Sequence, residues 1–184
     1  MRNPLKSIAL VLVGLALFSA CDNKKSVQEY YVEKQENNNF IAIDLPASLV
    51  SLDEGASEET RATLKTIKKL NVLAFKVDES NRAEYEKEYA QVKEILKSDK
   101  YNELMRMKHE GINIVINYQG SDEAVDEFIL LASDNTKGFA LARVLGDNMK
   151  PAQIVKMAED MKNIDADGSA LAELGDLFSD VDID

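Results

Sequence analysis

The sequence lacks the residues from which many functional sites are built. Tryptophan is absent from the 184 residues, proline occurs three times, and cysteine and histidine occur once each. The single cysteine, Cys21, excludes a disulfide within the chain and a cysteine-rich zinc site. The single histidine, His109, lies between polar residues at an expected helix-to-strand junction, where a solvated turn histidine is the ordinary interpretation. A histidine base also needs an orienting carboxylate and a nucleophile near it.

Motifs of common enzyme classes are missing as well. The sequence contains no Gly-x-Ser-x-Gly motif and no glycine-rich phosphate loop, so nucleophilic hydrolysis and nucleotide binding lack their usual parts. The paired methionines Met105 with Met107 and Met157 with Met161 suit Cu(I), but packing of thioethers in the core is the more ordinary interpretation. We therefore expect no cofactor and no catalytic residues.

Positive charge is also scarce. The chain has 22 basic and 33 acidic residues, a formal net charge of −11. Removal of residues 1–20 deletes two of the basic residues and none of the acidic ones, which takes the net charge to −13. Such a chain repels nucleic acid and anionic lipid surfaces, so nucleic-acid binding is excluded as a leading hypothesis.

The one long hydrophobic run lies at the N-terminus. Arg2 and Lys6 precede an apolar segment at 7–18, and the small residue Ala20 stands directly before Cys21. This is the pattern of a secretory signal, and its run is shorter than the ~20 residues of a membrane-spanning helix. A cysteine at this place predicts a lipobox, with cleavage between Ala20 and Cys21 and lipid attached to the Cys21 thiol.

The expected cellular location of the protein follows from that lipid. Residues 1–20 are the signal peptide, and 21–25 are a lipidated N-terminus and short tether. The alternative is an uncleaved N-terminal anchor with an incidental cysteine. Either way the chain faces the far side of the inner membrane, anchored in the cell envelope on the periplasmic face or in the outer membrane, with the leaflet left open.

Four segments of the mature chain have the spacing of amphipathic helices. Ser26 and Glu29 form a capping box at the start of the first, Ser57 begins the second, Asn81 can cap the third, and Pro151 suits the first position of the last. The inner stripe of the second helix is Thr60, Leu64, Ile67 and Leu70. The third has the clearest stripe, at Tyr85, Tyr89, Val92 and Leu96.

Five further segments, 40–44, 72–77, 112–118, 128–133 and 139–145, have the composition of strands. The last three are expected to form an antiparallel meander, and 101–108 a turn or short helix. Within 112–118, Asn113, Val115 and Asn117 alternate with isoleucines, which predicts one buried and one wet face.

The order α-β-α-β-α-β-β-β-α predicts an α+β fold: a single domain at 26–162 with a mostly antiparallel sheet of about five strands and helices packed on one face.

Residues 163–184 form an acidic C-terminal tail whose apolar patch can make a short helix. That tail also holds a calcium-loop candidate. Asn163, Asp165 and Asp167 have the alternate spacing of an EF-hand loop, but Glu173 falls one residue before the position that closes the shell.

Segments 69–73, 101–108 and 139–146, together with Gly111, resemble a lipoprotein family common in the Bacteroidota and catalogued as domain of unknown function 4252. The resemblance covers about 26–162, mostly at core and turn positions. It implies an envelope lipoprotein linked to envelope stress or signalling, and it supplies no catalytic residues.

Three functions therefore stay open. The leading hypothesis is a non-catalytic interaction or sensing module that binds an unidentified protein partner. The second is a carrier or binder of a small or lipidic ligand held between sheet and helices, which requires an apolar cavity. The third is an envelope hydrolase, which requires two carboxylates converging in a cleft.

The lipid anchor predicts the behaviour of a single substitution. Cys21→Ser removes the thiol that accepts the acyl chains, each buried methylene of which contributes about 0.8 kcal/mol to membrane binding. We expect wild type in the membrane fraction, carrying acyl mass on its first residue, and the variant without acyl mass and largely lost from that fraction. Retention of the variant in washed membranes, measured by immunoblotting, would contradict the anchor.

Overall fold

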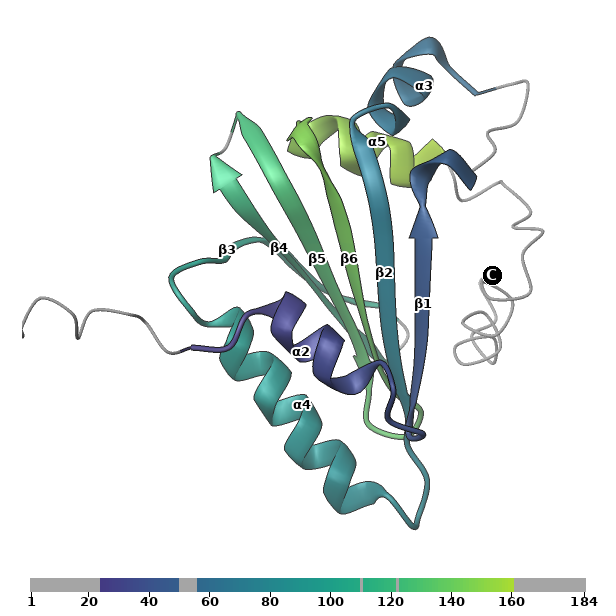
Figure 1. The fold of residues 1–184 in the computed structure, drawn as a ribbon, viewed down its shortest axis with the longest axis vertical. Coiled ribbons are helices and arrows are strands. Elements are labelled where there is room, and N and C mark those ends of the chain that lie inside the picture. Colours follow the sequence, from purple (N-terminus) through teal and green to yellow (C-terminus); the bar gives the residue numbers. More distant parts are fainter. Residues whose placement is uncertain (1–23, 50–55, 110, 122, 161–184) are drawn as a thin grey trace, which may run out of the picture.

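One open sheet of six antiparallel strands, in the order β1-β2-β6-β5-β4-β3, forms the framework of the domain (Figure 1). It is seen in a computed structural model that describes residues 24–49, 56–109, 111–121 and 123–160. In chain order the elements are α2 (Val27–Lys34), β1 (Phe40–Pro46), the 3-10 helix η2 (Ala47–Leu49), α3 (Glu58–Leu64), β2 (Ile67–Lys76), α4 (Arg82–Leu96), β3 (Asn102–His109), β4 (Ile112–Ser121), β5 (Ala124–Asp134), β6 (Gly138–Met149) and α5 (Pro151–Asp160). The expected class, helices packed on an antiparallel sheet, is confirmed.

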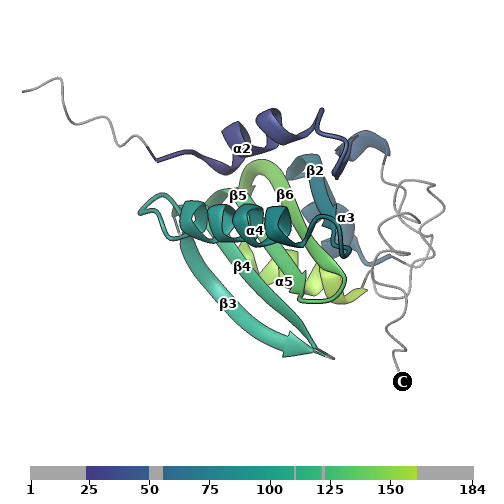
Figure 2. The same ribbon diagram turned by 90° about the horizontal axis from the view of Figure 1, so that it is seen from below.

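Three phenylalanines in register form the centre of the core. Phe75 on β2 is paired with Phe40 on β1 and with Phe139 on β6. The ring centroids of Phe40 and Phe75 are 5.0 Å apart and those of Phe75 and Phe139 are 5.9 Å apart. Full burial of such a side chain stabilises a fold by about 1.5–3 kcal/mol. We call the side of the sheet that carries these rings the helical face, because α2 and α4 lie across it (Figure 2).

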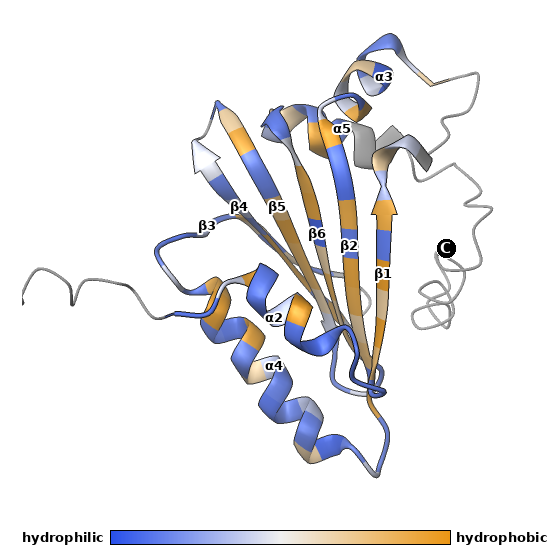
Figure 3. Cartoon of the chain, viewed as in Figure 1, coloured by the Kyte–Doolittle hydropathy of each residue, from blue (hydrophilic) through white to orange (hydrophobic). Residues whose placement is uncertain are grey.

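Helix α4 buries Tyr85, Val92 and Leu96 of its expected stripe, and the fourth member, Tyr89, is partly buried against the same cluster. The buried residues of α2 and α4 that join the phenylalanine cluster are Val27, Tyr30, Tyr31, Tyr85, Val92, Ile95 and Leu96. The outer surfaces of the two helices are largely hydrophilic, whereas hydrophobic segments run along β1, β2, β5 and β6 (Figure 3). Amphipathic helices on an apolar sheet face are therefore the main source of this core.

Helix α5 departs from the expectation that all helices pack on one face. Ile154 of α5 packs against a separate cluster of Val125, Phe128 and Met149. Phe128 precedes Ile129, which belongs to the phenylalanine cluster, and successive strand residues point to opposite faces. Helix α5 therefore covers part of the opposite face. The run 128–131 in β5 is apolar throughout, so both faces of this central strand require cover.

The sheet has one strand more than expected, because 101–108 is not a turn or short helix. Its glutamate, leucine, methionine, arginine and lysine residues are good helix formers in isolation. Strand β3 nevertheless pairs along its length with β4, from Asn102 opposite Tyr118 to His109 opposite Ile112. Tertiary pairing with a strongly β-forming neighbour outweighs local propensity here. His109 accordingly ends a strand, rather than lying between a helix and a strand.

Two further boundaries differ from the sequence expectation. Helix α3 ends at Leu64, and Ile67 and Leu70 belong to β2, where Leu70 pairs with both Leu45 and Val144. The capping box of Ser26 and Glu29 and the start of α5 at Pro151 are confirmed.

Asn81 precedes α4 but does not cap it with its side chain. Its Oδ1 accepts from the backbone N–H of Asp78, and its Nδ2 donates to the carbonyl of Lys76, so the side chain closes the loop after β2 instead.

The turn between β5 and β6 depends on a glycine. Gly138 has φ +129, and a Cβ there would overlap the carbonyl oxygen of Phe75. Gly138→Ala therefore combines backbone strain with a steric clash, and we expect it to lower the free energy of unfolding by about 3 kcal/mol or more. Gly111→Ala is the control: Gly111 has φ +92, but the nearest atom to its Cβ is Asp134 Oδ2 at 3.6 Å. That variant should lose only about 1–2 kcal/mol. Equal losses in urea unfolding would contradict the clash.

Candidate functional site

A cleft opens on the helical face where α4 crosses the outer strands. We call it the α4 cleft; its volume is about 330 Å³, at the lower end of the range for small-molecule sites. Strands β3 and β4 curve away from α4 in the view of Figure 2. The residues that line the cleft are Tyr89, Lys93, Leu96 and Lys97 at the end of α4, Glu103 and Arg106 on β3, Asn113, Val115 and Asn117 on β4, and Leu131 on β5.

The periodicity of each element places these side chains together. Lys93 and Leu96 lie four and seven residues after Tyr89, on one side of the helix. Alternate residues of β4 share one face of the strand. The register sets Val115 between Arg106 and Leu131. The cleft therefore follows directly from the antiparallel pairing of β3, β4 and β5 beneath the last turns of α4.

The floor of the cleft is apolar except for one amide. Leu96, Val115 and Leu131 are buried, and Asn117 is only 3% exposed. The Asn117 Oδ1 atom is buried without a hydrogen-bond partner. Leaving a buried acceptor unpaired costs about 1–3 kcal/mol, and buried polar groups in native proteins are almost always paired. The Asn117 Oδ1 atom is therefore a buried acceptor without a partner, and almost none of its surface is open to the cleft.

The rim is cationic in a chain of net negative charge. Lys93 Nζ lies 5.1 Å from the centroid of the Tyr89 ring, and the Tyr89 hydroxyl is 3.0 Å from Ser133 Oγ. Lys97 reaches Glu94 only at 3.4 Å, and both side chains are largely exposed.

On β3, the Arg106 guanidinium donates to both oxygens of Glu103, at 3.2 and 2.6 Å. These bonds lower the pKa of the Glu103 carboxyl and raise the pKa of Arg106. Glu103 is therefore already engaged by Arg106.

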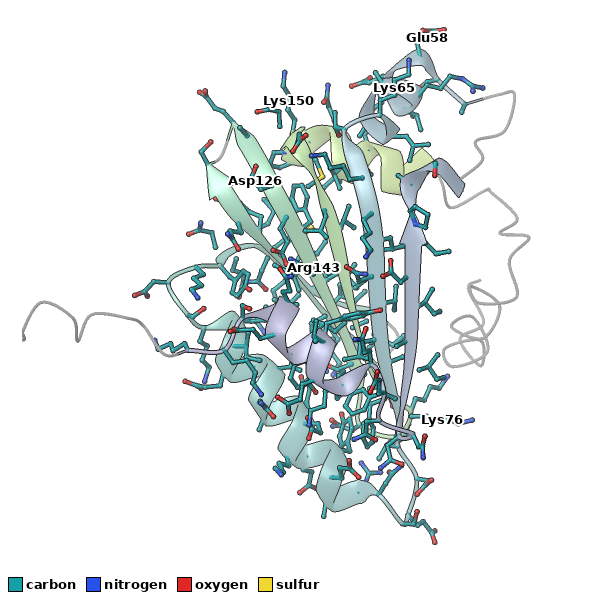
Figure 4. All side chains as sticks on the ribbon, viewed as in Figure 1. Glu58, Lys65, Lys76, Asp126, Arg143 and Lys150 are labelled. Atoms are coloured by element: carbon teal, nitrogen blue, oxygen red, sulfur yellow. The ribbon has the colours of Figure 1, made fainter. Side chains whose placement is uncertain are left out.

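Beside the cleft, buried ionic networks fix α2 against the sheet. Arg143 lies in the middle of the sheet next to α2 (Figure 4), and its Nε donates to Glu127 Oε1 at 2.5 Å. Its Nη2 donates to Gln28 of α2 at 3.2 Å.

Between the two helices, Glu88 of α4 accepts from Lys34 Nζ at 2.7 Å and from the Tyr30 hydroxyl at 2.9 Å. Burial raises the pKa of Tyr30, and so does this bond. Burial alone would lower the pKa of Lys34, but its bonds to Glu88 and Glu33 outweigh that effect and raise it.

The α4 cleft holds one carboxylate, Glu103, whereas the hydrolase hypothesis requires two acids. Among the described residues, no group of three or more histidine, cysteine, aspartate or glutamate side chains could hold a metal ion.

The site residues proposed from the sequence do not belong to the α4 cleft. Ala20, Cys21 and the calcium-loop candidates Asn163, Asp165, Asp167 and Glu173 lie outside the described residues. So do the signal peptide at 1–20 and the tail at 163–184, and no helix of the part that is described is long and apolar enough to span a membrane. On β3, Met107 is 45% exposed at the sheet edge, away from the core position expected for it.

Sequence reasoning did not predict the burial of Asn117, one of the residues that line the α4 cleft. The alternation in β4 predicts that Asn113, Val115 and Asn117 form a wet face, yet Val115 and Asn117 are buried beneath the helical layer. The isoleucines that alternate with them are only partly buried, on the opposite face. The usable signal was a pair of asparagines flanking a valine, because a polar strand face beneath a helix needs partners.

Comparisons with known proteins give one match. A model of the family described as Domain of unknown function (DUF4252) matches residues 30–157, which includes every residue that lines the α4 cleft. No match was found among the curated proteins or the solved structures.

The unpaired amide predicts an unusual effect on stability. Asn117→Val removes a buried acceptor without a partner, so we expect the ligand-free domain to become more stable by about 1–2 kcal/mol. Asn71→Val is the matched control: Asn71 is also 3% exposed and lies on a strand, but its side chain interacts with the Tyr31 hydroxyl and lowers the pKa of that group, against the larger effect of burial, which raises it. The control should lose about 1 kcal/mol or more. Urea unfolding that shows similar destabilisation in both variants would contradict an unpaired Asn117.

Proposed function

The chain belongs to the DUF4252 family, and we propose that it is a lipid-anchored, non-catalytic binding and sensing module of the cell envelope that takes a small or lipidic ligand into the α4 cleft. The cleft carries this proposal. It combines apolar side chains on α4, β4 and β5 and the Tyr89 ring with a cationic rim of Lys93, Lys97 and Arg106, the mixture of many apolar and a few polar groups that small-molecule sites use.

The proposed anchor gives this site a location. Val27 begins α2 six residues after Cys21, and a fully extended chain of that length spans about 20 Å. A lipid on Cys21 would therefore hold the domain close to the membrane surface. Such a position suits a protein that samples amphipathic molecules released from, or entering, the membrane.

A protein partner remains part of the proposal, because sensing requires that the bound state be read. Strand β3 supports this role, since it lies at the edge of the sheet and edge strands can pair with an extended peptide. The same strand contributes Glu103 and Arg106 to the cleft. A partner on β3 would thus contact the strand that also forms the cleft wall.

Occupancy of the cleft can be tested with the protein isolated from its own membranes. Asn113→Trp places an indole in the cleft from its rim, whereas Gln119→Trp adds the same group to an exposed position of β4 outside the cleft. We expect organic extracts of the wild type and of Gln119→Trp to contain the same small molecule by mass spectrometry, and extracts of Asn113→Trp to lose it. A molecule retained equally by Asn113→Trp, or extracts without any bound molecule, would overturn the proposal.

A further inference from the structure

The opposite face of the sheet, away from α2 and α4, carries two neighbouring rows of apolar side chains. In each row the register places one residue from every strand side by side, in the order of the strands from β1 to β3. The first row consists of Ile41, Ala74, Ala140, Ala132, Ile114 and Met107. The second row consists of Ile43, Val72, Ala142, Leu130, Ile116 and Met105. We call these residues the apolar rows.

Helix α5 lies over the end of this face and not over its whole length. Its Ile154 packs against the cluster that contains Phe128, one row further toward the end of β6. Figure 1 shows α5 beside that end of the sheet, while the strands continue well beyond the helix. The cluster of Ala74, Ala140 and Ile41 in the first row contains no residue of a helix among the residues that the structure describes.

The side of the apolar rows nearest β1 is nevertheless shielded from solvent. Val72 is 4% exposed, although its neighbours Ala74 and Ala142 are too small to cover its outer methyl groups. Ile43 is 7% exposed, although β1 is an edge strand and gives it a neighbouring strand on one side only. At the other edge, by contrast, Met107 on β3 is 45% exposed. The burial on β1 and β2 therefore calls for a further segment of the chain as a second layer.

Of the longer segments outside the described residues, 161–184 is the one placed to supply this layer. The chain before α2 enters the domain on the helical face (Figure 2). Residues 50–55 follow β1, but Ile41 lies about 17 Å back from Pro46 along that strand, and six residues are too short to reach it and return. Helix α5 already lies on the opposite face, and the chain continues from its end at Asp160.

We propose that residues 169–178 form an amphipathic helix that packs across β1, β2 and β6 over the apolar rows. The pattern of this segment supports the proposal, because its large apolar residues have the i, i+3, i+6, i+7 spacing of one helix side. These residues are Leu171, Leu174, Leu177 and Phe178. Asp176 lies on the other side of such a helix, where it faces solvent.

The lengths also agree. A helix of ten residues is about 15 Å long and crosses three strands that are spaced about 4.8 Å apart. The eight residues 161–168 can span up to about 28 Å, whereas the second row lies only about 7 Å from the row beneath α5. Ala74, Ala140 and Ala142 lie under the path of the helix, and their small side chains let it approach the sheet closely. The proposal does not depend on a ligand in the α4 cleft, which opens on the other face.

Paired cysteines test the contact in the full mature chain, because Cys21→Ser leaves no other cysteine. Ala142→Cys with Leu174→Cys should be joined within one chain by a short bifunctional thiol reagent, giving a crosslinked monomer in denaturing electrophoresis. Lys87→Cys with Leu174→Cys is the control: Lys87 is exposed on α4, on the other side of the sheet, so this pair should stay unjoined. A crosslink only between two chains would assign the apolar rows to a second copy and overturn the proposal, and so would the absence of any crosslink.

Two variants that introduce the same residue test the energetics. Leu174→Asn removes a leucine from the proposed contact, so urea unfolding should show a ratio of folded to unfolded chain that is about tenfold lower or less. Asp176→Asn changes the solvent-facing side and should leave the ratio nearly unchanged. Leu174→Asn should also bind more of a fluorescent apolar dye, because the apolar rows become exposed. Equal unfolding midpoints for the two variants would show that the segment does not pack on the sheet.

Discussion

The pairing of β2 with β6 holds the two parts of this fold together. Strands β3 to β6 follow one another along the chain as a meander, whereas β1 and β2 come before α4 and join it only through this ladder. The ladder aligns Phe75 with Phe139 and Leu73 with Leu141, four side chains that are almost fully buried. Helices α2 and α4 pack on the surface that these residues create. The position of every other element on the helical face depends on this register.

Helix α2 is fixed with polar groups as well as apolar ones. Arg143 bridges Glu127 and Gln28, and Glu88 bridges Lys34 and Tyr30. Removing one partner of a buried ion pair typically costs about 3–5 kcal/mol, a large share of the 5–15 kcal/mol that stabilises an ordinary domain. Apolar contacts are not directional and would let α2 slide along the sheet, whereas these hydrogen bonds fix the position of α2. Helix α2 therefore covers one side of α4 firmly and leaves the other side, above β3 and β4, open.

The elements with strong local signals were the predictable ones. The α4 helix, the Ser26 capping box and the existence of strand β4 all correspond to observed structure, because each depends on residues close in sequence. Strand β3 could not be found in this way, since its helix-forming residues become a strand only through pairing with β4. The placement of α5 on the opposite face and the burial of Asn117 likewise depend on which face each helix covers. Periodicity identifies two faces of a strand, but it does not say which one is covered.

The composition of the α4 cleft is hard to explain by folding alone. Filling it with larger apolar side chains and replacing Asn117 with a hydrocarbon would remove an unpaired acceptor and bury more surface, and both changes stabilise ordinary domains. Lys93 and Lys97 are exposed, so the packing of the core does not require two lysines at these neighbouring positions. Polar groups that lower stability and yet converge on one cavity are typical of sites retained for binding. The unpaired amide of Asn117 weakens the domain, because a buried acceptor without a partner loses the hydrogen bonds that water gives it in the unfolded chain.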